Sequence, residues 1–193
     1  YDCGSPTGIF YPSLFLYPSA ILFKLGIPLH IAYNVLFIFI VFSGAFCAFI
    51  AGKIFFNDQK LATIFSTLYI SAWYFQINLY ARGDFGEALG SAFFPLALIA
   101  SRCLLKNSND SWILAVLSYT GLIQSHILTT IMFCMFLIAV WIFEMIRQKS
   151  IDILDWKIFG KILITTIGLN AFFIIPFLQL YFTTEINISN GAL

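Results

Sequence analysis

The feature that most constrains this chain is the length of its apolar runs. The hydrocarbon core of a bilayer is about 30 Å thick, and a helix needs about 20 apolar residues to cross it. The run from Trp112 to Ile146 is almost entirely apolar and is too long for one crossing. We therefore expect it to fold as a helical hairpin that turns near Gln124, Ser125 and His126.

The composition indicates that lipid is the solvent for most of this chain. Hydrophobic residues make up 61% of the 193 residues and charged residues only 10%, whereas soluble domains carry about 25% charged residues. The mean hydropathy is +0.93. The net charge is only +1, and no basic patch is dense enough to hold a phosphate backbone. We expect membrane lipids, and no nucleic acid, among its partners.

The sequence predicts an all-α integral membrane protein with six transmembrane helices and short interfacial helices. We expect residues 1–193 to form a single transmembrane domain. The chain begins with Tyr1 and shows no signal peptide, so we interpret it as a piece of a longer polytopic protein. The expected spans are residues 29–51, 61–79, 88–105, 111–126, 128–146 and 159–181.

The positions of Lys and Arg predict the orientation of these spans, because cytoplasmic loops carry an excess of basic residues. If both ends of the chain lie outside, only Lys24 and Arg82 fall on the outer side. Residues 1–28, the loop 80–87, His126 and the C-terminal tail are then outside. The basic residues on the inner side are Lys53, Lys60, Arg102, Lys106, Arg147, Lys149, Lys157 and Lys161.

Residues 1–28 are expected to stay outside the bilayer core. They mix Gly and Pro with Phe, Tyr and Leu, and Pro12, Pro18 and Pro28 forbid one long helix. The apolar pieces between the prolines are too short to cross a bilayer, which favours short helices lying in the membrane interface. A re-entrant or buried loop is the alternative.

Three charged residues, Arg82, Asp84 and Glu87, lie within six positions between two apolar runs. An ordinary hydrated loop between two spans would explain them without any function. The loop is short, however, which holds the charges at the membrane surface, and a carboxylate at a helix N-terminus is favoured by the helix dipole. Arg82 also offers a planar fork of donors that suits a phosphate or a carboxylate. The triplet is therefore a candidate site for an anionic headgroup.

His126 is expected on the same outer side as the charged triplet. A single histidine in an apolar turn is most often a hydrogen-bonded structural residue, which is one interpretation. The second interpretation is a functional role beside the triplet, because ionisable groups at membrane depth usually face a cavity.

Three segments of the chain resemble bacterial polytopic membrane proteins of the GT-C type. Residues 1–26, YDCGSPTGIFYPSLFLYPSAILFKLG, are similar to the stretch after the first extracytoplasmic loop of that group. Residues 80–98, YARGDFGEALGSAFFPLAL, resemble its Y.RG.laE.la.aflPl signature, and residues 121–133, GLIQSHILTTIMF, resemble its l..sH..t turn. The group includes membrane proteins labelled 6-pyruvoyl-tetrahydropterin-synthase-related and is akin to the YfhO-like proteins.

This resemblance implies a GT-C-like fragment of a membrane glycosyltransferase in the bacterial cytoplasmic membrane, with its site on the external face. Such enzymes transfer a sugar from a polyprenyl-phosphate donor to an extracytoplasmic acceptor, such as a cell-envelope glycan or lipid. The reaction needs a base for the acceptor proton and positive charge for the departing phosphate. A divalent metal ion, Mg or Mn, is the cofactor that this chemistry would admit.

The same resemblance suggests which residues form the site. Asp2 lies close to where the acidic residue of the first external loop could fall, and it is the candidate catalytic residue. The main catalytic carboxylate is expected upstream of this fragment. The candidate substrate-binding residues are Arg82, Asp84, Glu87, Tyr80 and His126.

Two other functions also fit the sequence. A lipid or glycan transporter (a flippase) would need polar side chains at mid-membrane depth, for which Asn34, Gln124 and Asn170, with Ser and Thr residues, are the candidates. A non-catalytic membrane scaffold would share nearly all of these features. An acidic motif after a preceding span, upstream of residue 1, would favour the enzyme, and its absence would favour the scaffold.

Overall fold

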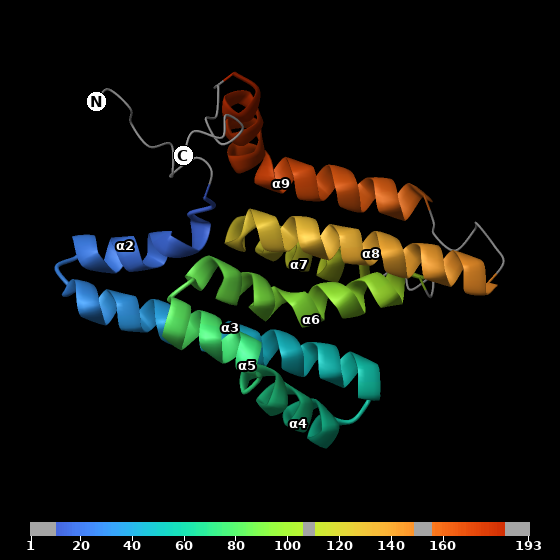
Figure 1. The fold of residues 1–193 in the computed structure, drawn as a ribbon, viewed down its shortest axis with the longest axis horizontal. Coiled ribbons are helices and arrows are strands. Elements are labelled where there is room, and N and C mark those ends of the chain that lie inside the picture. The colour runs from blue at the N-terminus through green and yellow to red at the C-terminus, as the bar shows by residue number, and fades with distance from the viewer. Residues whose placement is uncertain (1–10, 106–110, 149–155, 184–193) are drawn as a thin grey trace, which may run out of the picture.

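The computed structural model describes residues 11–105, 111–148 and 156–183, and within these ranges it is helical without any β-strand. Four helices are long and apolar enough to cross a membrane. They are α3 (Leu29–Phe56), α6 (Phe85–Leu105), α8 (Ile127–Gln148) and α9 (Trp156–Thr183). Figure 1 shows α3, α6, α8 and the first part of α9 running side by side along the long axis of the molecule. The chain is thus an all-α membrane protein.

The segment predicted as one span over residues 61–79 is instead broken into three pieces. These are α4 (Gln59–Ile70), α5 (Trp73–Gln76) and the π-helical η2 (Ile77–Arg82). The break occurs because Ala72 is extended, with φ −60° and ψ 138°. The side-chain amide of Gln76 donates to the carbonyl of Ile70 at 2.5 Å, which satisfies an acceptor next to the break. Together the three pieces still lead the chain back along α3 (Figure 1).

The long apolar run after residue 111 is divided at His126, within the turn predicted near Gln124, Ser125 and His126. α7 (Trp112–Ser125) ends there and α8 begins at the next residue. His126 itself is extended, with φ −156° and ψ 119°. α7 has 14 residues, which corresponds to a length of about 21 Å.

The N-terminal segment forms short helices, as predicted. η1 (Leu14–Leu16) leads into α2 (Tyr17–Lys24), and Pro18 lies in the first turn of α2. The chain then turns at Gly26, where φ is +90°, and Pro28 caps α3. Figure 1 shows α2 folded back alongside the first part of α3.

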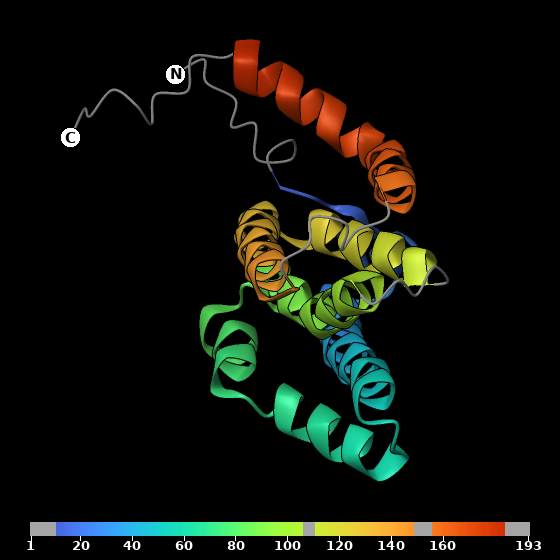
Figure 2. The same ribbon diagram turned by 90° about the vertical axis from the view of Figure 1, so that its right-hand side faces the viewer.

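The last helix, α9, is long but bent. It contains Pro176, which has no N–H to donate to the preceding turn. Figures 1 and 2 show the C-terminal part of α9 turning away from the direction of α8. The predicted span over residues 159–181 is therefore helical but not straight.

Small residues allow the helices at the centre of the bundle to approach closely. A Cβ added at Gly90 would lie 3.0 Å from the Thr129 side chain, and one at Gly121 would lie 2.6 Å from the ring of Phe93. Such close contacts are the main source of helix packing in lipid, where no hydrophobic effect drives helices together. Glycines in α6 and α7 thus fix the spacing between α6, α7 and α8.

A buried amide pair joins α7 to α9. The Gln124 side chain donates to Asn170 Oδ1 at 2.8 Å, and the Asn170 amide nitrogen donates to the Thr166 carbonyl at 2.8 Å and to Thr120 Oγ1 at 3.2 Å. Gln124 and Asn170 are both almost completely buried. A polar pair of this kind stabilises helix association within a bilayer.

We predict that Asn170→Leu lowers the free energy of unfolding by about 1 kcal/mol, because the Gln124 amide then loses its partner. Replacing Gln124 with Leu as well should recover part of that loss, since neither polar group remains. Denaturation in mixed micelles, followed by circular dichroism, measures both. Thr183→Ala is the control, because its hydroxyl bonds only within α9. If the double variant loses as much free energy of unfolding as the two single variants together, Gln124 and Asn170 do not stabilise the protein as a pair.

Candidate functional site

The charged triplet sits at a sharp turn between η2 and α6. η2 ends at Arg82, and Gly83 adopts a left-handed conformation with φ +63°, which glycine accepts without steric cost. The Asp84 N–H donates back to the Asn78 carbonyl at 3.0 Å and closes the turn. This local fold carries Arg82 on one side of the turn and Glu87 on the other, within reach of each other.

Arg82 forms a network with both carboxylates. Its Nη1 lies 2.8 Å from Glu87 Oε2, and its Nη2 lies 3.7 Å from Asp84 Oδ2. Nη1 also donates to the Oδ1 of Asn78 at 2.8 Å, and Asn78 is completely buried. One guanidinium therefore faces two carboxylates, and the three side chains carry a formal charge of −1 (+1 −2). The Glu87 side chain is 14% exposed and that of Arg82 52%, so the network lies at the boundary between the protein interior and its surface.

The two carboxylates also begin α6. Asp84 Oδ1 accepts the Glu87 N–H at 3.0 Å, which is the hydrogen bond of an N-cap residue. Glu87 lies in the first turn of the helix, where the helix dipole favours negative charge. Glu87 accepts a further hydrogen bond from the Tyr74 hydroxyl. The triplet therefore has a structural role in addition to any ligand that it binds.

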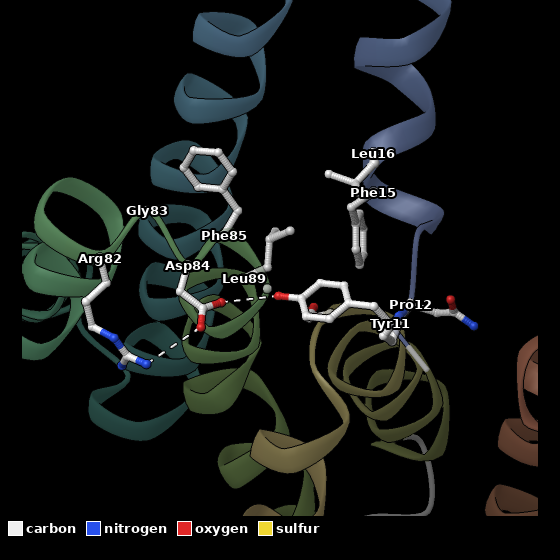
Figure 3. Close-up of a pocket in the computed structure, with 12 residues that line it drawn as sticks. Tyr11, Pro12, Phe15, Leu16, Arg82, Gly83, Asp84, Phe85 and Leu89 are labelled. Atoms are coloured by element: carbon white, nitrogen blue, oxygen red, sulfur yellow. Dashed lines mark hydrogen bonds and ion pairs between the residues drawn. The ribbon is translucent and has the colours of Figure 1, made fainter. Parts of the chain in front are cut away.

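Tyr11 covers this network from the N-terminal segment. Its hydroxyl donates to Asp84 Oδ1 at 3.2 Å, so Asp84 lies between Tyr11 and Arg82 (Figure 3). The Tyr11 side chain fits over Gly86, because a Cβ at that position would lie 2.0 Å from its hydroxyl oxygen. Burial and the neighbouring Asp84 carboxylate raise the pKa of Tyr11 to about 12. The hydroxyl thus stays protonated at neutral pH and remains a donor.

His126 is connected to the triplet only through Tyr11. The two rings lie with their centroids 5.8 Å apart. His126 Nδ1 lies 2.8 Å from Thr129 Oγ1 and accepts the Thr129 N–H at 3.3 Å. These bonds cap the first turn of α8, which agrees with the structural interpretation of His126, and its contact with Tyr11 places it beside the site.

Tyr80 is not brought to this site. Tyr80 is 67% exposed, and its ring packs edge-on against Phe37, with centroids 5.0 Å apart. It does not line the cavity that opens beside Asp84, described below. Asp2 lies outside the described residues.

A cavity of about 410 Å³ opens beside Asp84. Figure 3 shows its walls, with Tyr11, Phe15 and Leu16 from the N-terminal segment facing Asp84, Phe85 and Leu89 from the start of α6. Both sides carry apolar side chains, and the Tyr11 hydroxyl reaches Asp84 between them. The lining residues are Tyr11, Pro12, Phe15, Leu16, Arg82, Gly83, Asp84, Phe85, Gly86, Leu89, Gln124 and Ser125.

Sequence reasoning missed three residues that organise the site. Asn78 lies four positions before Arg82, and this helical spacing is a signal that could have identified it. Tyr74 lies 13 positions before Glu87 and Tyr11 lies 73 positions before Asp84. Neither separation has a local pattern, so only the fold brings these tyrosines to the carboxylates.

The described residues do not by themselves complete a site for a divalent metal ion. Mg²⁺ requires near-octahedral coordination by oxygen, and Asp84 and Glu87 are two carboxylates that both face the guanidinium of Arg82. No group of three or more His, Cys, Asp or Glu side chains that could hold a metal occurs in the described ranges. We therefore assign no step to the predicted Mg or Mn ion.

We predict that Asp84→Ala lowers the free energy of unfolding by about 1 kcal/mol through loss of the N-cap. Asp84→Asn should cost about 0.5 kcal/mol, because Asn caps the helix but does not pair with Arg82. Thermal denaturation in detergent checks both values.

Asp58 supplies the matched control, because its Oδ1 caps α4 by accepting the Leu61 N–H at 2.8 Å. Asp58→Ala should resemble Asp84→Ala, whereas Asp58→Asn should be nearly neutral. If Asp84→Asn proves as stable as the wild type, the pairing of Asp84 with Arg82 contributes nothing measurable to stability.

Comparison with protein-family models, with curated proteins and with solved structures finds no match for this chain. The resemblance to GT-C-type proteins therefore stays an expectation based on its three motifs. The observations that bear on function are the ionic network, the cavity beside it and the helix bundle that carries them.

Proposed function

We propose that this chain is part of a membrane glycosyltransferase that moves a sugar from a polyprenyl-phosphate donor to an acceptor outside the cytoplasmic membrane. The observation that carries this proposal is the network of Arg82, Asp84 and Glu87 at one end of an apolar helix bundle. Two of its members, Arg82 and Asp84, line the cavity there. A lipid-linked sugar requires this combination of a polar pocket and apolar surroundings.

The cavity suits the sugar in size and chemistry. Its volume of about 410 Å³ lies within the range of about 300–1,000 Å³ that is usual for small-molecule sites. Carboxylate oxygens accept hydrogen bonds from sugar hydroxyls, and the rings of Tyr11, Phe15 and Phe85 offer apolar surface to the C–H groups of the sugar. Both kinds of surface meet in this cavity (Figure 3).

Arg82 is the residue that we assign to the donor phosphate. Its contact with Asp84 is the longer of its two ion pairs, 3.7 Å against 2.8 Å for Glu87. A phosphate oxygen can therefore take the place of Asp84 on Nη2 while Glu87 continues to hold Nη1. Arginine suits this role because its planar fork can bind two oxygens at once.

Asp84 is then free to act as the base. Its carboxylate takes the proton of the acceptor hydroxyl as the acceptor oxygen bonds to the anomeric carbon. The bond from that carbon to the phosphate oxygen breaks, and the polyprenyl phosphate leaves with the electron pair, stabilised by Arg82. Tyr11 holds Asp84 Oδ1 through its hydroxyl and orients the carboxylate for this transfer.

In this proposal the cavity faces the outside of a bacterial cytoplasmic membrane, and the chain crosses the bilayer six times. The second crossing is the broken segment from α4 to η2, and α7 and α8 form the hairpin. Basic residues support the orientation, since six of them lie at the opposite end of the bundle. They are Lys53, Lys60, Arg102, Arg147, Lys157 and Lys161.

A flippase gains no specific support from the buried polar groups. Transport would require polar side chains that line a path through the bilayer. Gln124 and Asn170 instead hydrogen-bond to each other and hold α7 against α9. The sugar-transfer assay described next distinguishes the enzyme from a non-catalytic scaffold.

We predict that Arg82→Ala reduces the rate of sugar transfer by about a hundredfold or more, because a charge-assisted contact with the phosphate is worth about 2–4 kcal/mol in the transition state. Arg82→Lys should restore only part of the rate, since lysine lacks the fork. The measurement is transfer from a polyprenyl-phosphate sugar by the full-length protein in liposomes.

Arg147→Ala is the matched control for this experiment. Arg147 also pairs with a glutamate, Glu144, at 2.7 Å, but it lies at the opposite end of the bundle (Figure 1). Its variant should keep the wild-type rate. If Arg82→Ala and Glu87→Gln also transfer sugar at the wild-type rate, the triplet is an ordinary loop. If the wild type transfers none, the scaffold is favoured.

The orientation has its own test. On a cysteine-free background, a cysteine at Asp84 should react with a membrane-impermeant reagent from outside the cell, and a cysteine at Arg147 only from the cytoplasmic side. The two positions lie at opposite ends of the bundle, so their labelling should be reciprocal. Labelling of the Asp84 cysteine only from inside would overturn the external site.

A further inference from the structure

The end of the bundle opposite the cavity carries a strong excess of positive charge. Its described basic residues lie at the ends of α3, α6 and α8 and at the starts of α4 and α9 (Figure 1). Its described acidic residues are Asp58, which caps α4, and Glu144, which pairs with Arg147. Six positive and two negative charges leave +4 (6 −2). The basic residues are Lys53, Lys60, Arg102, Arg147, Lys157 and Lys161.

Arg102 differs from Arg147 at this end. Its guanidinium carbon lies over the ring of Phe55, 4.3 Å from the ring centroid, and within the described ranges it forms no ion pair with a carboxylate. The side chain is exposed. A cation–π contact holds the guanidinium in place but leaves its N–H donors available to an anion.

An apolar cleft of about 240 Å³ begins beside Arg102. It lies between α4 and α6, and α3 forms its floor with Ala51 and Gly52. Phe55 is 54% exposed and Phe56 41%, so the aromatic wall is open to the surroundings of the bundle. The cleft is lined by Ala51, Gly52, Phe55, Phe56, Phe65, Pro95, Leu98, Ile99 and Arg102.

We propose that this cleft binds one anionic phospholipid of the bilayer, with the phosphate on Arg102 and an acyl chain between α4 and α6. Charge complementarity identifies the headgroup, because the described residues at this end carry a charge of +4 and Arg102 has no carboxylate partner in the described part of the chain. An apolar cleft that ends at a cation suits an amphipathic anion. Anionic lipids are attracted to basic residues that lie close to a membrane surface. The proposal does not depend on sugar transfer, which concerns the other end of the bundle.

Native mass spectrometry of the full-length protein tests this site, with dioleoyl-phosphatidylglycerol as the anionic lipid and dioleoyl-phosphatidylcholine as the zwitterionic one. We expect one phosphatidylglycerol to bind at least about tenfold more tightly than phosphatidylcholine, and Arg102→Gln to remove that preference. Arg147→Gln is the control at the same end and should retain it. Equal affinity for the two lipids in the wild type would overturn the proposal.

Two further measurements separate a built site from general attraction. Leu98→Trp fills the cleft without changing the charge, and it should weaken phosphatidylglycerol binding by about tenfold. Glycerol phosphate, which has no acyl chain, should not displace the lipid at equal concentration. Unchanged binding in either Arg102→Gln or Leu98→Trp, equal weakening by Arg147→Gln, or displacement by glycerol phosphate would each overturn the site.

Discussion

The pairing of Arg82 with Glu87 and Asp84 is the interaction on which the cavity end of the bundle depends. A carboxylate that is largely buried is unfavourable unless it is paired and hydrogen-bonded, and Glu87 is 14% exposed. Arg82 supplies the charge, Tyr74 supplies a hydroxyl, and Asn78 fixes the guanidinium. These contacts hold η2 against α6 across the turn at Gly83. Tyr11 then attaches the N-terminal segment to Asp84, and the cavity lies between that segment and the start of α6.

The sequence was sufficient for those parts of the fold that depend on apolar length. The runs that became α3, α6, α8 and α9 were recognisable because a helix in lipid must satisfy its own backbone and expose apolar side chains. The break at Ala72 was not recognisable in the same way. At the break, the Gln76 side chain donates to the Ile70 carbonyl in place of a backbone N–H. A hydropathy pattern does not indicate such a hydrogen bond. The fold-back of α2 along α3 likewise depends on contacts and not on composition.

The same distinction holds for the candidate site. Arg82, Asp84 and Glu87 were conspicuous because they are charged residues in an apolar sequence, and their closeness along the chain brings them together in space. Asn78 follows the spacing of a helical turn. Tyr11 could not be predicted, since its role comes from a contact across 73 positions and from the absence of a side chain at Gly86. His126 lies beside Tyr11, but its direct bonds are to Thr129 and serve the start of α8.

If α7 is one of six spans, as we propose, its length has a consequence for the membrane beside it. Its 14 residues extend about 21 Å, which is shorter than the hydrocarbon core of about 30 Å. Such hydrophobic mismatch is relieved when the bilayer thins locally or when neighbouring groups extend to cover the deficit. Because α7 ends at the cavity, thinning here would lower the headgroups toward Asp84. In the proposed reaction, the phosphate of the lipid-linked sugar would then meet Arg82 at the depth where its own headgroup already lies, without being lifted out of the leaflet.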